Sequence, residues 1–234
     1  MTQAEEKGSE ALGREVRSLA RAADRGALAS ALADGRPYVS LVLLAWDLDG
    51  TPLLLLSDLA EHSRNLARDA RLALLIDGTR GLADPLTGPR ASLIGQAAPI
   101  RDDRRLARFL ARHPSAESYA GFADFKLYRV ALERAHFVAG FGRIRWIEQR
   151  DLVLSGDFSA LAGAEGAILA AMNGERLAEL DRIVGRGPGW RMTGLDPEGA
   201  DFRRGGETAR VDFAKPICSG EAALNELARL AGRN

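Results

Sequence analysis

The chain has 234 residues and a mass of 25.1 kDa, with 46% hydrophobic and 27% charged residues, values that fit an ordinary globular protein. The 32 Lys and Arg residues balance 32 Asp and Glu residues, so no basic excess indicates a nucleic-acid partner. A single cysteine, Cys218, excludes an intrachain disulfide framework, and a zinc site of ordinary ligand type would need nearly all of the three histidines. We attribute the richness in Arg and Ala to genome composition rather than to a phosphate-binding surface.

The first 30 residues resemble neither a signal peptide nor a transit peptide. The longest apolar stretch, around Val39 to Trp46, is far shorter than the ~18 residues that span a membrane. We therefore expect a cytoplasmic protein without a membrane partner.

Hydrophobic periodicity predicts a first helix over residues 11–33, because Leu12, Val16 and Leu19 share one face. The predicted helix ends before Pro37, because proline disfavours a helical conformation of the residue that precedes it. Two strands follow, 38–46 and 53–56, joined by an Asp-Gly turn, and then a helix 57–68 that Ser57 would cap. The next predicted elements are a strand 71–76, a loop 77–90, a strand 91–100, and a helix from Asp102 or Asp103 to His113.

Two long strands, 127–132 and 136–147, are expected to form a hairpin with a turn near Glu133 and Arg134. After a connector that reaches about residue 164, the pattern predicts a helix 165–184, three short strands 190–195, 200–204 and 208–213, and a helix 219–231. The strands come in hairpins and do not alternate regularly with helices. The order therefore predicts a mainly antiparallel β protein, with a split β-barrel over 1–150 and a small α+β domain over 160–234.

Glycines interrupt the predicted strand 136–147 in the segment Gly140-Phe141-Gly142-Arg143. Two glycines in alternation open one face of a strand to a ligand or to another backbone. Arg143 would lie on the opposite face, where its guanidinium could bind a phosphate or a carboxylate. The alternative interpretation is a curved barrel strand with exposed arginines.

A second candidate site begins where the predicted strand 53–56 ends. We expect Ser57, His62, Arg64 and Asn65, helped by Arg90, to form an edge that receives a phosphate or a propionate. The physical reason is that helix N-termini carry free N–H groups and partial positive charge, which favour an anion. His62 would help most when it is protonated. The alternative is an ordinary capped helix with a solvated polar face.

Several of these segments together resemble the haem-utilisation (HugZ-type) branch of the pyridoxamine 5'-phosphate oxidase-like FMN-binding split barrels. The segments that carry the resemblance are Ser57-Asp58-Leu59-Ala60-Glu61-His62-Ser63-Arg64-Asn65-Leu66, Asp84-Pro85-Leu86 with Arg90, His136-Phe137-Val138-Ala139-Gly140-Phe141-Gly142-Arg143, and the segment Trp190 to Gly199 in the second part. The resemblance implies a homodimer with a small-molecule ligand at the subunit interface.

The resemblance also implies site residues. The region matching His62 to Asn65 would hold the FMN phosphate, with Arg90 nearby, and Gly140, Gly142 and Arg143 would belong to the same cofactor site. In haem-degrading relatives an arginine that matches Arg143 contacts haem, and a C-terminal histidine binds the iron. This chain has no histidine after residue 136, so His62 and His136 are the candidate iron ligands.

Three functions remain open at this point. The leading hypothesis is an FMN-binding, oxidoreductase-like protein, in which the flavin supplies the chemistry. The alternative is a haem-binding or haem-degrading, haem oxygenase-like protein, and the third is a ligand-free dimeric structural or regulatory module. No residue has a pattern that assigns it a catalytic role.

Overall fold

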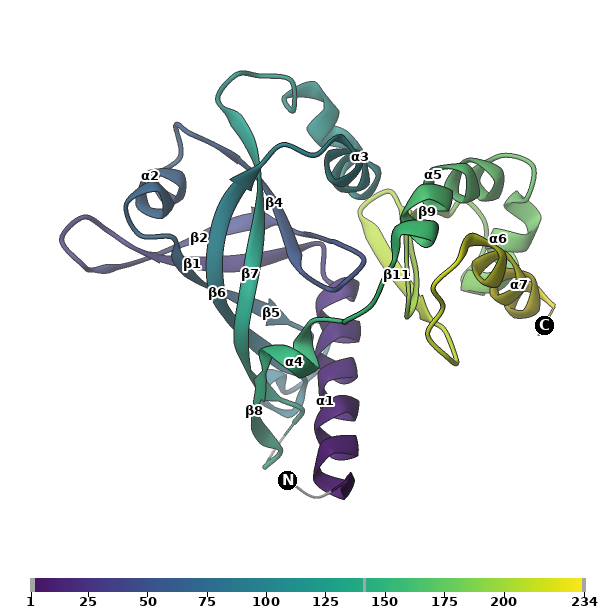
Figure 1. Cartoon of the computed structure of the whole chain (residues 1–234), viewed down its shortest axis with the longest axis horizontal. Coiled ribbons are helices and arrows are strands. Elements are labelled where there is room, and N and C mark those ends of the chain that lie inside the picture. Colours follow the sequence, from purple (N-terminus) through teal and green to yellow (C-terminus); the bar gives the residue numbers. More distant parts are fainter. Residues whose placement is uncertain (1–2, 141, 233–234) are drawn as a thin grey trace. The chain divides into compact units, whose positions relative to one another are not determined.

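The structure is a computed structural model that describes residues 3–140 and 142–232. The chain divides into two compact units, Met1–Leu154 and Ser155–Asn234. Each unit has its own sheet and its own helices (Figure 1). Within the described ranges, no helix is both long and apolar enough to cross a membrane.

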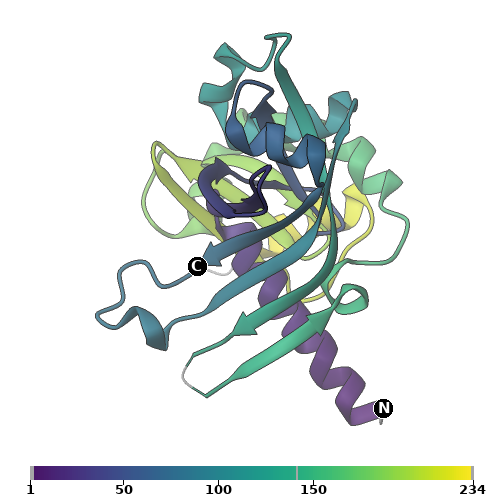
Figure 2. The same ribbon diagram turned by 90° about the vertical axis from the view of Figure 1, so that its left-hand side faces the viewer.

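The first unit is built around a curved, eight-stranded antiparallel sheet in the order β2-β1-β5-β6-β7-β4-β3, with β8 paired to β7. Figure 2 shows β5, β6, β7 and β8 side by side, with the loop after β5 and the turn after β7 at the same end of the sheet. The strands are β1 (Arg25–Ala31), β2 (Pro37–Leu43), β3 (Ala45–Trp46), β4 (Pro52–Ser57), β5 (Arg71–Asp77), β6 (Arg90–Ile100), β7 (Phe125–Val138) and β8 (Ile144–Glu148).

The helices of this unit are short except for the first. They are α1 (Gln3–Ala22), α2 (Glu61–Arg68), α3 (Asp103–Arg112) and α4 (Gln149–Leu152), with the 3-10 turns η1 (Pro85–Thr87) and η2 (Pro114–Ser118). Helix α1 supplies Val16 and Ala20 to the main apolar core, which is lined by the inner faces of the strands. Burial of each large core side chain stabilises the fold by roughly 1.5–3 kcal/mol, so α1 closes the barrel mainly through apolar contacts.

Arginines of α3 bind α1, the end of β3 and the turn that follows β3. Arg104 and Arg105 donate to the two carboxylate oxygens of Asp47, at 2.7 and 2.5 Å. One and two turns further on, Arg108 donates to the carbonyl oxygen of Trp46, and Arg112 donates to that of Arg21 at 2.7 Å. The spacing of four residues places these arginines on one side of the helix.

The second unit combines helices α5 (Ser159–Asn173), α6 (Leu177–Val184) and α7 (Gly220–Ala231) with the sheet β11-β10-β9. Its antiparallel strands are β9 (Arg191–Asp196), β10 (Gly199–Arg204) and β11 (Glu207–Asp212). Arg210 crosses the sheet and binds Asp196 at 2.7 Å and Asp201 at 3.1 Å. Burial opposes its charge, but these carboxylates hold the pKa of Arg210 above its ordinary value.

The predicted fold class is confirmed, with an antiparallel half-barrel followed by helices and a three-stranded antiparallel sheet. The predicted last helix, 219–231, is present as α7, and Ser219 caps it by accepting from the Ala222 N–H through Oγ. The single predicted helix 165–184 was wrong, since α5 and α6 are separate helices and α5 begins inside the predicted connector.

The predicted helix over residues 11–33 was wrong in its second half. Helix α1 ends at Ala22, and Arg25–Ala31 forms strand β1. Alanine favours a helix locally, but β1 pairs with both β2 and β5, so it gains ladder hydrogen bonds on both edges. Tertiary pairing therefore overrides the local preference.

The predicted hairpin within residues 127–147 was also wrong in its register. Strand β7 runs without interruption through Glu133 and Arg134, where a β-bulge leaves Glu133 without a paired residue in the β6–β7 register. The turn lies instead at residues 139–143, so residues 136–147 do not form one strand. Gly140 and Gly142 have φ angles of 131° and 79°, which favour glycine and reverse the chain there.

Acid should weaken this fold through Asp47. Burial raises the pKa of Asp47, but the hydrogen bond and charge of Arg104, with the hydrogen bonds from Arg105 and the Leu48 N–H, outweigh burial and lower it to about 2. Because the pKa of Asp47 is lower in the folded state than in the unfolded chain, its ionised carboxylate stabilises the fold at pH values above the unfolded-state pKa of 3.8. That stabilisation is lost as the pH falls toward the folded-state pKa of about 2.

We therefore expect Asp47→Asn to lower the free energy of unfolding at pH 7 by on the order of 2 kcal/mol. The variant should also show a flatter loss of stability between pH 4 and pH 2, measured by urea unfolding across that range. Asp34→Asn is the matched control, because Asp34 is exposed. Equal pH profiles for wild type and Asp47→Asn would contradict this account of Asp47.

Candidate functional site

The predicted site residues fall into two groups at opposite ends of strand β7. Ser57 is paired with Phe125, the first residue of β7, whereas Arg90 is paired with Val138, the last. At about 3.3 Å per residue, these ends are separated by roughly 40 Å along the strand. Within one chain, Arg90 therefore does not reach the anion edge that the sequence analysis places at Ser57.

Ser57 ends strand β4 and does not cap a helix. Its hydroxyl donates to Asp124 at 2.5 Å and accepts from the Leu59 N–H at 3.1 Å. Helix α2 begins four residues later, at Glu61, and its N-cap Ala60 provides no side-chain hydrogen bond. The predicted helix start at Ser57 was wrong, because Ser57 pairs in the sheet and its hydroxyl stabilises the turn that follows.

His62 lies in the first turn of α2 and is half-buried. Its Nδ1 shares a hydrogen bond of 3.0 Å with the hydroxyl of Ser40 on β2. Burial lowers the pKa of His62, so the imidazole is neutral at pH 7. His62 thus contributes a polar ring rather than a positive charge to this end of the sheet at neutral pH.

Arg64 is exposed and faces an acidic neighbour. Its guanidinium lies 3.5 Å from a carboxylate oxygen of Glu61, one turn earlier on α2. Glu61 also lies 3.7 Å from Arg68. A carboxylate in the first turn offsets the positive end of the helix, so an incoming anion would compete with Glu61 for Arg64.

Asn65 is fully buried and is engaged on both sides. Its amide nitrogen donates to Ser30 on β1 at 3.1 Å, and its amide oxygen accepts from Arg68 at 2.6 Å. The contact with Ser30 fastens α2 to the inner face of the sheet, whereas the contact with Arg68 lies within α2. In this structure, Asn65 positions the helix and does not face solvent.

At the other end of β7, Arg90 and Gly140 meet at the turn η1. Arg90 Nη1 donates to the carbonyl oxygens of Leu86 and Gly88, both at 3.2 Å. A Cβ atom on Gly140 would lie 3.0 Å from the carbonyl oxygen of Thr87, closer than real Cβ atoms normally approach. The space that Gly140 provides is therefore taken by the chain's own backbone.

Gly142 and Arg143 lie in the β7–β8 turn. The Ala139 N–H donates to the Arg143 carbonyl oxygen at 3.0 Å, which closes the turn. Arg143 is exposed and lies 3.5 Å from Glu15 on α1. Gly142 has open space around its Cα, and Phe141 lies outside the described residues. Arg143 was expected within a strand, and its place in a turn corrects that expectation.

The outward face of the sheet carries a set of side chains that the sequence analysis did not treat as a site. The cross-strand register places them in two rows, Leu41, Ala27, Leu75, Ser92, His136 and Trp146 in one and Val39, Ala29, Ala73, Ile94, Arg134 and Glu148 in the other. Val39 and Leu41 are 60% and 70% exposed. This outward sheet face is unusually apolar for an exposed surface.

His136 and Trp146 form the polar end of the outward sheet face. Their ring centroids are 4.9 Å apart, and the guanidinium of Arg134 lies 4.5 Å from the Trp146 ring centroid. Among the described residues, none makes a hydrogen bond to the ring nitrogens of His136. His113, by contrast, is buried and bound to the Leu44 carbonyl oxygen at 2.8 Å.

A sequence signal for this face existed. An antiparallel strand with one solvated face normally alternates apolar and polar residues. In the segment Tyr38 to Leu43, by contrast, large apolar side chains occur at both the odd and the even positions. The pattern indicates a strand whose outward side is also apolar. No group of three or more His, Cys, Asp or Glu side chains in the described ranges is arranged to hold a metal ion.

Comparison with known families identifies the fold. The sequence profile of the family described as pyridoxamine 5'-phosphate oxidase matches residues 12–139, more than half of the chain. The chain belongs to the pyridoxamine 5'-phosphate oxidase family. The half-barrel of residues 1–154 is thus the split barrel of that family, as the sequence resemblance predicted.

Solved structures that resemble this family member extend the similarity to nearly the whole chain. A protein of unknown function from Agrobacterium tumefaciens is 27% identical, covers 94% of each chain and has a TM-score of 0.80. A heme binding protein from Mycobacterium smegmatis is 29% identical, with 94% of this chain and 96% of that chain covered and a TM-score of 0.57.

A curated relative is similar over a shorter stretch. The chloroplastic heme oxygenase HOZ of Arabidopsis thaliana is 34% identical over 112 residues, which cover 46% of this chain and 33% of the relative. The matched part therefore spans about a third of that protein's length.

The two neighbouring residues of α2 should respond differently to substitution. Asn65→Ala removes two buried hydrogen bonds and leaves Ser30 and Arg68 without that partner, which should cost about 1–3 kcal/mol in the free energy of unfolding. Arg64→Ala removes an exposed ion pair and should change stability by at most about 1 kcal/mol. Urea unfolding of both variants measures the difference, and equal effects would refute the anchoring role of Asn65.

Proposed function

We propose that this member of the pyridoxamine 5'-phosphate oxidase family binds haem. Support comes from the heme binding protein of Mycobacterium smegmatis, which is similar over 94% of this chain, and from the 34% identity to the heme oxygenase of Arabidopsis thaliana. The observation on this chain that carries the proposal is the outward sheet face, where a histidine without a hydrogen-bond partner on its ring nitrogens borders exposed apolar side chains.

The residues of the outward sheet face fit the chemistry of haem. A porphyrin is a large flat apolar ring, and Leu75 and Trp146 expose apolar surface of that kind, 44% and 50% of the respective residues. The imidazole of His136 is a common type of iron ligand when a ring nitrogen is free to bind. His136 is therefore the candidate axial ligand.

Arginines near His136 suit the two carboxylates of a haem. Arg134 lies two residues earlier on the same face of β7, and Arg90 lies in a neighbouring cross-strand row, paired with Val138. Guanidinium groups bind carboxylates through charge-assisted hydrogen bonds. Bound haem supplies a redox-active iron, while the chain's own residues would bind the ring, hold the propionates and exclude water from one face.

FMN was the leading expectation from the sequence, and haem now takes its place as the proposed cofactor. Two relatives, at 29% and 34% identity, are named for haem. The residues expected to hold a flavin phosphate give a weaker case, since Asn65 is buried against Ser30 and Arg64 faces Glu61. FMN binding, and an oxidoreductase activity through it, is the competing outcome of the same experiment.

The test is a spectroscopic titration of the purified protein with haemin and, separately, with FMN. We expect a saturable Soret band with haemin and no quenching of FMN fluorescence. His136→Phe keeps the aromatic packing against Trp146 but removes the ring nitrogens, so it should shift the Soret band and weaken haemin binding at least about tenfold, or ~1.4 kcal/mol.

His62→Phe is the matched control, because His62 is the other candidate ligand and lies on α2. It should leave the haemin spectrum unchanged. A spectrum altered by His62→Phe but not by His136→Phe would move the ligand to α2, and saturable binding of FMN without haemin binding would overturn the proposed function.

We propose, in addition, that the apolar part of the outward sheet face, around Val39, Leu41 and Leu75, pairs with a second copy of the chain. Small residues, Ala27, Ala29 and Ala73, separate these large ones in the cross-strand rows, which permits close approach of an identical face in a two-fold dimer. A ligand held at His136 would then lie beside the interface between the two copies.

A homodimer should have about twice the 25.1 kDa mass of the chain in light scattering at micromolar concentration. Leu41→Glu places a charge in the proposed interface and should yield a monomer of unchanged secondary structure. Leu177→Glu, at an exposed leucine of the second unit, is the control and should remain dimeric. A wild-type mass near 25 kDa would contradict the proposed dimer.

A further inference from the structure

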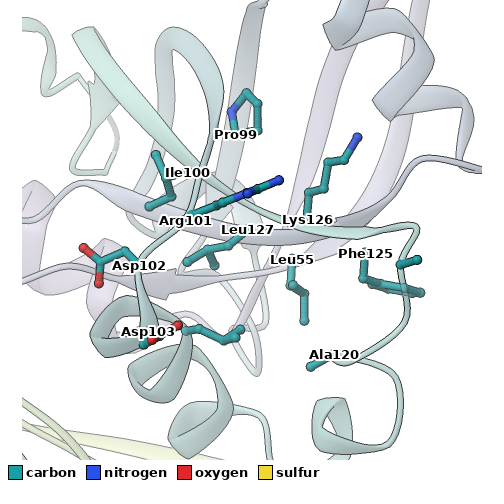
Figure 3. Close-up of a pocket in the computed structure, with 12 residues that line it drawn as sticks. Leu55, Pro99, Ile100, Arg101, Asp102, Asp103, Ala120, Phe125, Lys126 and Leu127 are labelled. Atoms are coloured by element: carbon teal, nitrogen blue, oxygen red, sulfur yellow. The ribbon is translucent and has the colours of Figure 1, made fainter.

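A pocket of about 560 Å³ lies at the start of β7, away from the outward sheet face. Its walls come from β4, the end of β6, the beginning of α3 and the connection from α3 to β7 (Figure 3). The lining residues are Leu55, Pro99, Ile100, Arg101, Asp102, Asp103, Leu106, Ala120, Ala123, Phe125, Lys126 and Leu127. Pockets of 300–1,000 Å³ accommodate small organic molecules.

The pocket's lining is mainly apolar. Leu55 and Leu127 face each other across the β4–β7 pair, and Leu106 of α3 and Ile100 pack into the same apolar cluster. Phe125 closes the side nearest the α3–β7 connection and contacts the ring of Tyr119 at a centroid distance of 4.7 Å. These side chains would contact the apolar part of a ligand.

Two positive side chains border the pocket, and only one of them is neutralised. Lys126 forms an ion pair of 2.6 Å with Asp58. This hydrogen bond to Asp58 raises the pKa of Lys126, and the nearby charge of Arg101 opposes the rise. Among the described residues, none forms an ion pair or hydrogen bond with the Arg101 side chain. Arg101 therefore keeps an unpaired positive charge beside Lys126.

The acidic residues of the pocket belong to the beginning of α3. Asp102 accepts from the Arg105 N–H at 2.9 Å and binds the Arg105 guanidinium, so its carboxylate is already occupied. Figure 3 shows Asp102 and Asp103 on the α3 side, while the Arg101 side chain extends toward Lys126. An anion bound by the Arg101 guanidinium would therefore lie on the Lys126 side of the pocket, among lining residues that include Leu55 and Leu127.

We propose that this pocket binds an amphipathic monoanion, a compact apolar molecule that carries a single carboxylate, sulfonate or phosphate group. Arg101 binds the anionic group, and the apolar lining binds the rest. The site is separate from the proposed haem site, because Lys126 and His136 are ten residues apart on β7, roughly 30 Å along the strand.

Two fluorescent probes test this proposal in protein without haem. The first is 8-anilinonaphthalene-1-sulfonate, and the second is N-phenyl-1-naphthylamine, which has the same ring system without the sulfonate. We expect saturable binding of the sulfonate at one site per chain, with a dissociation constant that rises with salt concentration because a charge contact is screened.

Two substitutions separate the charge contact from the apolar contact. Arg101→Gln should weaken binding of the sulfonate at least about fivefold and leave binding of the neutral probe unchanged. Ala123→Trp should fill the pocket and weaken both probes. Arg80→Gln, at another exposed arginine, is the matched control and should affect neither probe.

Equal sulfonate affinities in wild type and Arg101→Gln would overturn the proposal, as would undiminished binding of both probes to a folded Ala123→Trp variant. If Ala123→Trp lowers the thermal midpoint, the Arg101→Gln comparison decides alone, since Arg101 is exposed and has no partner to lose. The haemin titration has a different readout and depends on His136 instead of Arg101, so either proposal can fail without the other.

Discussion

The carboxylate of Asp47 fixes the geometry of the first unit. It lies in the turn between β3 and β4, is 2% exposed, and binds Arg104 and Arg105, which lie 57 and 58 residues later in the first turn of α3. An isolated charge at such a position would be strongly disfavoured, so Asp47 and the α3 arginines require one another. Through this contact, α3 is tied to the same turn that leads into β4, which is why the pocket between α3 and β4 has defined walls.

Buried arginines show that the high Arg content of this chain is not explained by genome composition alone. The abundance of Arg was attributed to genome composition, yet Arg108 and Arg112 are buried and donate to the main-chain carbonyl oxygens of Trp46, at the end of β3, and of Arg21, near the end of α1. A guanidinium has five donors in a fixed fork and reaches several carbonyls at once. A lysine has neither that geometry nor that reach, so the choice of Arg at these positions has a structural reason.

The fold could be predicted from the sequence because it depends on hairpin order and on residues of the family pattern, both of which are local. The failures came where distant pairing decides the outcome. Residues 25–31 have helical composition and become a strand because two strands pair with them. Glu133 looked like a turn and is a bulge, because a long partner strand, β6, continues past it.

The candidate site was predictable in its residues but not in its arrangement. Sequence reasoning grouped Ser57 and Arg90 through their shared anion chemistry, and the antiparallel register places them at opposite ends of β7. It also named His136 only as a possible ligand. Ser92 on β6 and Trp146 on β8 flank His136, and the leucines of the outward sheet face lie further along the same row, on β5 and β2. These strands share a face with His136 only after the sheet has formed.

The long β7 strand has a consequence for synthesis of the chain. Strand β4, with four consecutive leucines, pairs on one edge with the two-residue β3 and on the other with the first part of β7. On a ribosome, β4 therefore emerges some 70 residues before its main partner, at a rate of roughly 5–20 residues per second. For several seconds an apolar edge has no native partner, a period in which nascent chains are prone to pair with one another. Chaperone dependence of this protein would thus be concentrated before Phe125 is translated rather than after the chain is released.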